Sequence, residues 1–365
     1  MPENKNQHFV PKCHFKPFSV DRQGRCINVF NLRTTTVAIN ASTKGQCSRS
    51  YFYGQDPDIE PIFSAAESAY GSIMPRLIEA VGDELSLICK ALRSLSYLQY
   101  LRTEKELGSA KEYFRSALGA AHQGREPPRG DEIPDDWVIA RDAVLSWQKT
   151  SAYVADLKTV ILENRSDIPF ITSDNPAVLT NRLYCQKFGR TDFGVAQSGS
   201  ILFMPLSPRF ASISYDADAY ALASKSGHRV RVERGSDVRQ LNQLQAMNCV
   251  ENLYFTHSED AELVKGIAAE VVDLRVSRVH EMSVLIADGV RNDVERFRRA
   301  TEEELKSATR RLMVSKNVHP KPLLWPSFMP FRSPPTGYVS GTAVGVVRKA
   351  IAAERPDINF SKKRF

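Results

Sequence analysis

The sequence has few cysteines, and their spacing excludes the common cysteine-based sites. Six cysteines are scattered along 365 residues, and no two of them form a CxxC pair. This spacing excludes a zinc ribbon and a thioredoxin-type redox motif. We therefore expect reduced thiols that are mostly buried.

Long apolar runs are also missing. The apolar stretch 85–101 is interrupted by Lys90 and Arg93, so it cannot supply the ~20 apolar residues of a membrane span. The N-terminus, Met-Pro-Glu-Asn-Lys-Asn-Gln-His, lacks the basic and apolar regions of a secretory signal. We therefore expect a cytoplasmic protein that has no membrane partner.

Several nucleotide-binding and metalloprotease motifs are absent as well. The chain contains neither a GxGxxG string nor a GxxxxGK string followed by Ser or Thr. His280-Glu281 is not followed by a second histidine at the spacing of an HExxH zinc site. Any catalytic chemistry therefore has to come from a less familiar set of residues.

The positive charge is concentrated at one end of the chain. Lysine and arginine number 49 against 42 aspartates and glutamates, which gives a net charge of +7. Residues 305–365 contain twelve basic and two acidic residues, or +10, so residues 1–304 are near −3. Lys306, Arg310 and Arg311 begin this basic region, and its aromatic residues suit base stacking. Nucleic acid is therefore a candidate partner, and a solvated tail whose aromatics dock on the body is the alternative.

The pattern of elements predicts an α+β fold with an N-terminal β segment, a helical middle and a central mixed or antiparallel sheet. Alternating apolar residues predict strands within residues 1–55. Helical spacing predicts helices that begin near residue 56 and at 83–102, 104–121, 135–154 and 238–254, with a loop or hinge at 122–134. Short β-prone runs predict the sheet at 159–162, 170–172, 178–179, 201–204 and 210–215.

The rest of the chain divides into two further parts. Residues 1–257 form the predicted core, 258–311 are predicted to form one or two amphipathic helices, and 312–365 form a proline-containing basic extension. The prolines predict an absence of regular structure from about 312 to 342, followed by a short helix at 343–353.

Four islands of sequence are more distinctive than packing requires. They are Gln7-His8-Phe9-Val10-Pro11, the pair Glu60 and Glu67, Phe170-Ile171-Thr172-Ser173-Asp174-Asn175-Pro176, and Pro205-Leu206-Ser207-Pro208. In this order they resemble the family known as domain of unknown function 4238, over roughly residues 5–257. One departure is Cys13-His14, where family members usually have an aromatic residue and a leucine. The resemblance implies a shared fold and no established activity, so the function has to be argued from chemistry.

The first two islands offer an imidazole and two carboxylates. His8 lies on a segment that Pro11 helps to keep extended, and it suits a general base, a metal ligand or a phosphate contact; a hydrogen-bonded structural residue is the alternative. Glu60 and Glu67 are seven residues apart, so they share one helix face and are separated by about 10.5 Å of axial rise. Glu60 also suits the first turn of a helix for electrostatic reasons alone.

Asp174 is the strongest single candidate. It follows an apolar strand and precedes Asn175-Pro176, so a turn presents its carboxylate at a strand end, where sites are commonly built. The alternative is an Asx turn that merely links two strands.

These residues together predict a metal-dependent phosphodiester hydrolase of the nuclease type, bacterial and cytosolic. His8, Glu67 and Asp174 would be catalytic, Asp174, Glu67 and Glu60 would bind magnesium or manganese, and Gln7 and Asn175 would join the basic residues in binding substrate. The alternative is a non-enzymatic module whose QHFVP and SDNP motifs frame a recognition pocket for a ligand or partner. A third possibility is a purely structural network of buried hydrogen bonds.

Overall fold

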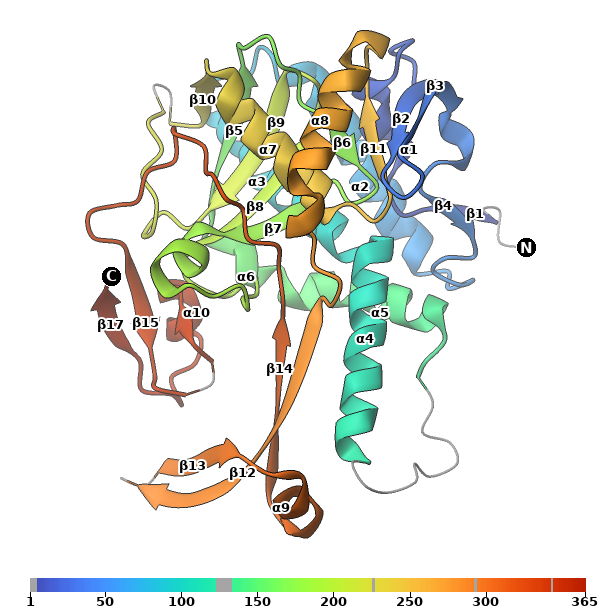
Figure 1. The fold of residues 1–365 in the computed structure, drawn as a ribbon. Coiled ribbons are helices and arrows are strands. Elements are labelled where there is room, and N and C mark those ends of the chain that lie inside the picture. The colour runs from blue at the N-terminus through green and yellow to red at the C-terminus, as the bar shows by residue number, and fades with distance from the viewer. Residues whose placement is uncertain (1–4, 123–132, 225–226, 292–293, 343) are drawn as a thin grey trace.

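A computed structural model describes residues 5–122, 133–224, 227–291, 294–342 and 344–365 (Figure 1). The fold is α+β, as predicted, with N-terminal strands, a helical middle and several antiparallel or mixed sheets. Most of the predicted hinge, residues 123–132, lies outside the described residues. Within the described residues, none of the helices is long and apolar enough to cross a membrane.

The central sheet has five strands in the order β10-β5-β9-β8-β7, and its neighbours are antiparallel except for the parallel pair β10 and β5. The bounds are β5 Lys158–Asn164, β7 Val178–Asn181, β8 Ser200–Pro205, β9 Phe210–Tyr215 and β10 Arg229–Val232. Strands β5 and β8 are buried on both faces over most of their length, which explains their nearly continuous apolar sequences.

Helices cover both faces of the central sheet. Because side chains alternate along a strand, Ile161 packs with α3 (Gly82–Leu101), whereas Val160 and Leu162 pack with α7 (Gly235–Asn248). Helix α8 (Ala261–Val271) lies against α7 on that second face (Figure 1).

A second, four-stranded sheet has the antiparallel order β3-β2-β11-β6. Its strands are β2 Cys26–Asn31, β3 Thr36–Ser42, β6 Thr172–Ser173 and β11 Asn252–Phe255. The predicted strand 170–172 therefore belongs to this sheet and not to the central one. The QHFVP island contributes β1 (Asn6–His8), which pairs with β4 (Ser48–Ser50), followed by the short helix α1 (Lys12–Phe15).

The helical middle agrees with its prediction. Its remaining helices are α2 Ile59–Arg76, α4 Glu104–Ala121, α5 Asp136–Thr150 and the short α6 Ala152–Ala155. Phe63 of α2, Leu98 of α3 and Val144 of α5 share one apolar cluster with Phe9 and Phe15. This packing places the QHFVP segment directly against α2 and α3.

The helices predicted at 258–311 are wrong beyond α8. The chain forms instead an antiparallel arm of β12 His280–Arg291, β13 Val294–Arg299 and β14 Arg311–Asn317, with the short helix α9 Glu302–Ser307. The arm extends from the lower part of the molecule beside α4 (Figure 1). An apolar residue every third position suits a helix, but the β-prone run from Ser283 to Ile286 pairs with β14, and that tertiary pairing decides the outcome.

The proline-containing extension has more regular structure than predicted. Besides β14, it forms β15 Thr336–Val339, β16 Val346–Val347, the short helix α10 Lys349–Ala353 and β17 Ser361–Arg364. Most of the prolines fall between β14 and β15, where they break no strand. Trp325 and Met329 of this linking segment are buried in the main apolar core, so the aromatic part of the extension is docked on the body.

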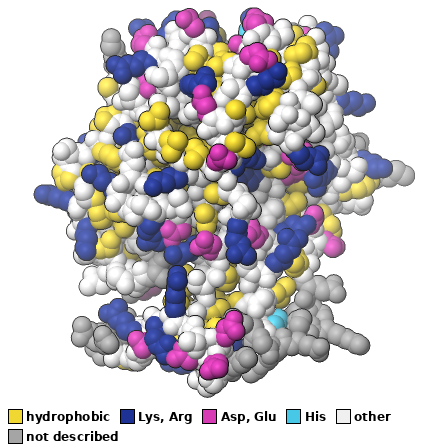
Figure 2. All heavy atoms as spheres, viewed as in Figure 1, with side chains coloured by type: hydrophobic (Ala, Val, Ile, Leu, Met, Phe, Trp, Pro, Cys, Tyr) yellow, Lys and Arg dark blue, Asp and Glu magenta, His cyan; other side chains and the backbone are white. Residues whose placement is uncertain are grey.

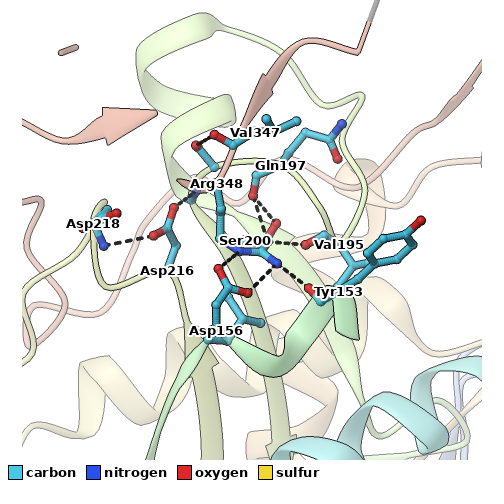
Figure 3. A network of polar contacts seen from close by, with 12 residues as sticks. Tyr153, Asp156, Val195, Gln197, Ser200, Asp216, Asp218, Val347 and Arg348 are labelled. Atoms are coloured by element: carbon cyan, nitrogen blue, oxygen red, sulfur yellow. Dashed lines mark hydrogen bonds and ion pairs between the residues drawn. The ribbon is translucent and has the colours of Figure 1, made fainter. Parts of the chain in front are cut away.

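Arg348 fastens the end of the extension to the body (Figure 3). Its guanidinium is 2% exposed and binds both carboxylate oxygens of Asp156 at 2.8 and 3.0 Å. It also donates to the carbonyl oxygens of Tyr153, Val195 and Gln197. One of the twelve basic residues of the extension is thus a buried structural contact and not a free surface charge.

Candidate functional site

Strand β1 is fixed in place by the side chain of Gln7. Its amide nitrogen donates to the Gly54 carbonyl at 3.0 Å, and its amide oxygen accepts from the Tyr53 N–H at 2.7 Å. Gln7 is buried, and both ends of its side chain are occupied by backbone groups. This residue, which the sequence assigned to substrate binding, therefore holds His8 beside α2.

A cavity of about 270 Å³ lies between β1, α2 and the end of α3. It brings together four of the nine predicted site residues, including both carboxylates of α2. Its lining residues are Asn6, Gln7, His8, Glu60, Phe63, Ser64, Glu67 and Arg102. The seven-residue spacing of Glu60 and Glu67 thus predicted their common face correctly.

The imidazole of His8 is half-buried in the wall of this cavity. Its Nε2 is buried and has no hydrogen-bond partner among the described residues. Burial, followed by the nearby charges of Lys12 and Arg102, lowers the pKa of His8 below its usual value, although contacts with the Lys44 and Asn6 backbones oppose this shift. His8 is therefore mainly neutral at pH 7, and its Nε2 donates or accepts one hydrogen bond according to which ring nitrogen carries the proton.

Arg102 is the residue of the cavity that the sequence reasoning missed. It follows directly after α3 and is 3% exposed. Its guanidinium donates to the His8 carbonyl at 2.6 Å, forms an ion pair with Glu67 at 3.3 Å, and lies 3.9 Å from the Phe63 ring centroid. Its Nε, like His8 Nε2, is buried without a partner among the described residues. The available signal was an arginine directly after a helix with a leucine-rich buried face.

A second, much smaller cavity of about 20 Å³ lies on the other side of Glu67 and Arg102. This volume suits about one water molecule. His14, which is buried here, contacts the Tyr70 hydroxyl at 3.1 Å and the Thr172 hydroxyl at 2.8 Å, so both ring nitrogens are occupied. Burial lowers the pKa of His14 to about 3, which keeps it neutral. At the Cys13-His14 departure from the family pattern, His14 is therefore a core residue whose ring nitrogens both have hydrogen-bond partners.

Asp174 does not join the larger cavity. Its carboxylate is 4% exposed and accepts hydrogen bonds of 2.7–2.8 Å from the backbone N–H groups of Val250, Glu251 and Asn252. Burial raises the pKa of Asp174, and the three amides oppose that shift. The carboxylate thus caps the chain between α7 and β11, a structural role that differs from the local Asx turn given as the alternative.

Asn175 has a similar role beside Asp174. Its side chain accepts a hydrogen bond from the Thr103 hydroxyl at 2.9 Å and donates to the Asn248 carbonyl at 3.1 Å. The SDNP turn is therefore held by internal contacts that leave no polar side-chain group of Asn175 for a substrate.

The predicted metal ligands are divided between these two places. Glu60 and Glu67 line the cavity, whereas Asp174 is held by backbone amides. Among the described residues, no group of three or more His, Cys, Asp or Glu side chains is arranged to hold a metal ion. The arrangement therefore does not fit the magnesium or manganese site expected from the sequence.

The predicted basic substrate-binding residues lie on the arm. Lys306 belongs to α9, Arg310 precedes β14, and Arg311 begins that strand. Arg310 forms an ion pair with Glu295 of β13 at 3.0 Å. The cavity, by contrast, is built by β1, α2 and the end of α3.

Comparison with known proteins supports the resemblance found in the sequence. The family model described as "Protein of unknown function (DUF4238)" matches residues 6–259, so this chain belongs to the DUF4238 family. No curated protein and no solved structure matches it.

Proposed function

For this member of the DUF4238 family, we propose that the cavity of His8, Glu60, Glu67 and Arg102 binds a small polar ligand that carries an ammonium group. The function proposed is that of a recognition pocket, the alternative that the sequence left open. Its volume of about 270 Å³ is near the lower end of the range for small-molecule sites.

The observation that carries this proposal is a pair of unsatisfied polar atoms beside one cavity. His8 Nε2 and Arg102 Nε are both buried and have no partner among the described residues. Buried polar groups nearly always have hydrogen-bond partners, so such atoms call for water or a ligand. Ligand oxygen atoms in the cavity would satisfy them, by accepting from Arg102 Nε and by bonding to His8 Nε2.

The charge of the lining indicates the other part of the ligand. Two carboxylates and one guanidinium give the lining a net charge of −1, because His8 is neutral. Glu67 already pairs with Arg102, whereas Glu60 has no ion pair or side-chain hydrogen bond among the described residues. A ligand ammonium group at Glu60 would balance this charge.

Metal-dependent hydrolysis of phosphodiesters is the less favoured function. It would need three ligands arranged around one ion, and although His8, Glu60 and Glu67 line one cavity, no three such side chains among the described residues are arranged to hold a metal ion. The prediction is tested by incubating the protein with RNA and DNA in magnesium or manganese. If the protein cleaves RNA or DNA and Glu67→Gln abolishes that cleavage, the nuclease function is favoured over the binding module.

The direct test is binding of small amines, measured by thermal shift and calorimetry. Lysine, 4-aminobutan-1-ol and 4-aminobutanoate are the probes, because each carries an ammonium group together with a hydroxyl or a carboxylate, and butane-1,4-diol is the uncharged analogue of 4-aminobutan-1-ol. We expect at least one amine to raise Tm by several degrees at saturation, because a ligand that binds the folded state stabilises it. The diol should give a much smaller shift.

Glu60→Gln is the variant that identifies the site, and Glu79→Gln at an exposed position after α2 is its matched control. The first should weaken amine binding about tenfold, and the second should leave it unchanged. Absence of binding by all three amines, or equal binding by both variants, would refute the proposal.

A further inference from the structure

An apolar groove of about 540 Å³ lies between the β2–β3 hairpin and α8. Figure 2 shows hydrophobic side chains gathered over this upper part of the molecule. Phe30 and Ala268 are buried in the groove, whereas Val250 and Val272 are 37% and 58% exposed. Its full lining is Phe30, Leu32, Arg33, Thr35, Val250, Lys265, Ala268, Ala269, Val272 and Arg275.

The groove is separate from the cavity at His8. Side chains alternate along β2, so Val29 packs with Phe9 in the cluster beside the cavity, whereas Phe30 packs in the cluster that contains α8. The two sites therefore lie on opposite faces of the β3-β2-β11-β6 sheet, and a ligand in one does not require a ligand in the other.

The charged residues that line the groove are all cations: Arg33, Lys265 and Arg275. Arg275 is fixed, because it donates to the carbonyl oxygens of Ala246, Cys249 and Val250 at 2.5–2.9 Å. Arg33 and Lys265 are more accessible to a ligand, since their side chains are 75% and 42% exposed.

Both exposed cations have acidic partners that lie outside the lining. Arg33 pairs with Glu251 at 3.4 Å, and Lys265 pairs with Glu262 at 2.6 Å. Exposed ion pairs of this kind contribute little to stability. A ligand carboxylate can therefore replace either partner at small cost, and it would meet no carboxylate among the lining residues.

We propose that this groove binds a free long-chain carboxylate, with the alkyl chain on Phe30, Ala268 and Val272 and the carboxylate at Lys265 or Arg33. The exposed valines explain why an alkyl chain binds there, because its burial removes their apolar surface from water. The ring of cations without a lining carboxylate explains why the head group is an anion.

The test is calorimetric titration of the full chain with dodecanoate below its micelle concentration. Dodecanol and dodecyltrimethylammonium serve as probes with the same alkyl chain and a neutral or positive head group. We expect saturable one-to-one binding of dodecanoate, weaker binding of the alcohol and the weakest binding of the cation. Equal affinity for all three amphiphiles, or no binding of dodecanoate, would overturn the assignment.

Val272→Asp places a negative charge within the groove, and Val81→Asp makes the same substitution at a 73% exposed valine that precedes α3. The groove variant should bind dodecanoate at least about tenfold more weakly, because a carboxylate next to the ligand repels its head group and solvates the apolar wall. The control should bind normally. Unchanged binding in Val272→Asp, with circular dichroism showing that the variant is folded, would show that the groove is not the site.

Discussion

The turn at Asp174 and the cavity at His8 differ in whether their polar groups have hydrogen-bond partners. Both oxygens of the Asp174 carboxylate are used, by three backbone N–H groups. At the cavity, His8 Nε2 and Arg102 Nε are buried without partners, and Glu60 adds a carboxylate free of ion pairs among the described residues. The first arrangement stabilises the fold, whereas the second leaves two polar atoms unsatisfied beside a cavity. Motifs of equal prominence in the sequence therefore differ in whether their polar groups are already used.

The largest expected effect is that of Asp174→Ala. The substitution removes the acceptor of three backbone N–H groups at Val250, Glu251 and Asn252, and it should lower the free energy of unfolding by about 4 kcal/mol. Urea denaturation followed by circular dichroism measures this loss. A loss below about 1 kcal/mol, combined with altered ligand binding, would make Asp174 a site residue after all.

Arg348→Ala tests whether a fully hydrogen-bonded guanidinium stabilises the fold as the Asp174 carboxylate does. It leaves Asp156 without its main partner and frees the carbonyl groups of Tyr153, Val195 and Gln197, so we expect a loss of about 3 kcal/mol. Limited proteolysis should then cleave the C-terminal segment faster. Arg355→Ala, which removes an exposed partner of Asp357, is the control and should change neither result. Equal proteolysis of the two variants would show that Arg348 does not hold the extension.

His14 lies close to the cavity, but both of its ring nitrogens already have hydrogen-bond partners. Its burial makes the stability of the protein depend on pH. Burial lowers its pKa from 6.5 to about 3. The unfolded chain therefore takes up a proton near pH 6.5 that the folded chain refuses, so the stability is complete above pH 6.5 and falls as the pH drops toward 3. In that window His14 contributes a slope of up to about 1.4 kcal/mol per pH unit.

Urea denaturation between pH 7 and 4 measures this slope. His14→Gln should reduce it by about one proton, and His257→Gln, at an exposed position, should leave it unchanged. His319, whose pKa is also lowered to about 3 by burial, adds a second contribution that remains in both variants. An unchanged slope in His14→Gln would mean that His14 is protonated in the folded state.

The sequence predicted the parts of the fold that depend on local periodicity. The seven-residue spacing placed Glu60 and Glu67 on one face, and the apolar runs located four of the five strands of the central sheet, although β10 was not predicted. It could not predict the arm, because β12 is fixed by pairing with β14 about thirty residues later. The amphipathic pattern before β12 is helical in α8, and the error of the prediction was to continue helical structure into β12.

The site was predicted only in part, for a similar reason. The partners of Asp174 are backbone groups of residues 250–252, which carry no side-chain signal and lie more than seventy positions away. Arg102 reaches His8 across 94 positions. Residue types show which groups can do chemistry, but whether a group is already satisfied is decided by contacts distant in sequence.

The smallest expected effects come from replacing each of the two glutamates of α2 with glutamine. Glu60→Gln should change the free energy of unfolding by less than about 0.5 kcal/mol, because Glu60 has no partner to lose among the described residues. Glu67→Gln should cost about 1 kcal/mol, since it leaves the buried Arg102 guanidinium without its ion pair, although Glu67 is 38% exposed and water screens part of the loss. If both variants lose the same stability, Glu60 has a structural role, and the polar groups of the cavity are used within the protein as those of the Asp174 turn are. If Glu60→Gln is neutral in stability and still weakens amine binding, its carboxylate is kept for a ligand.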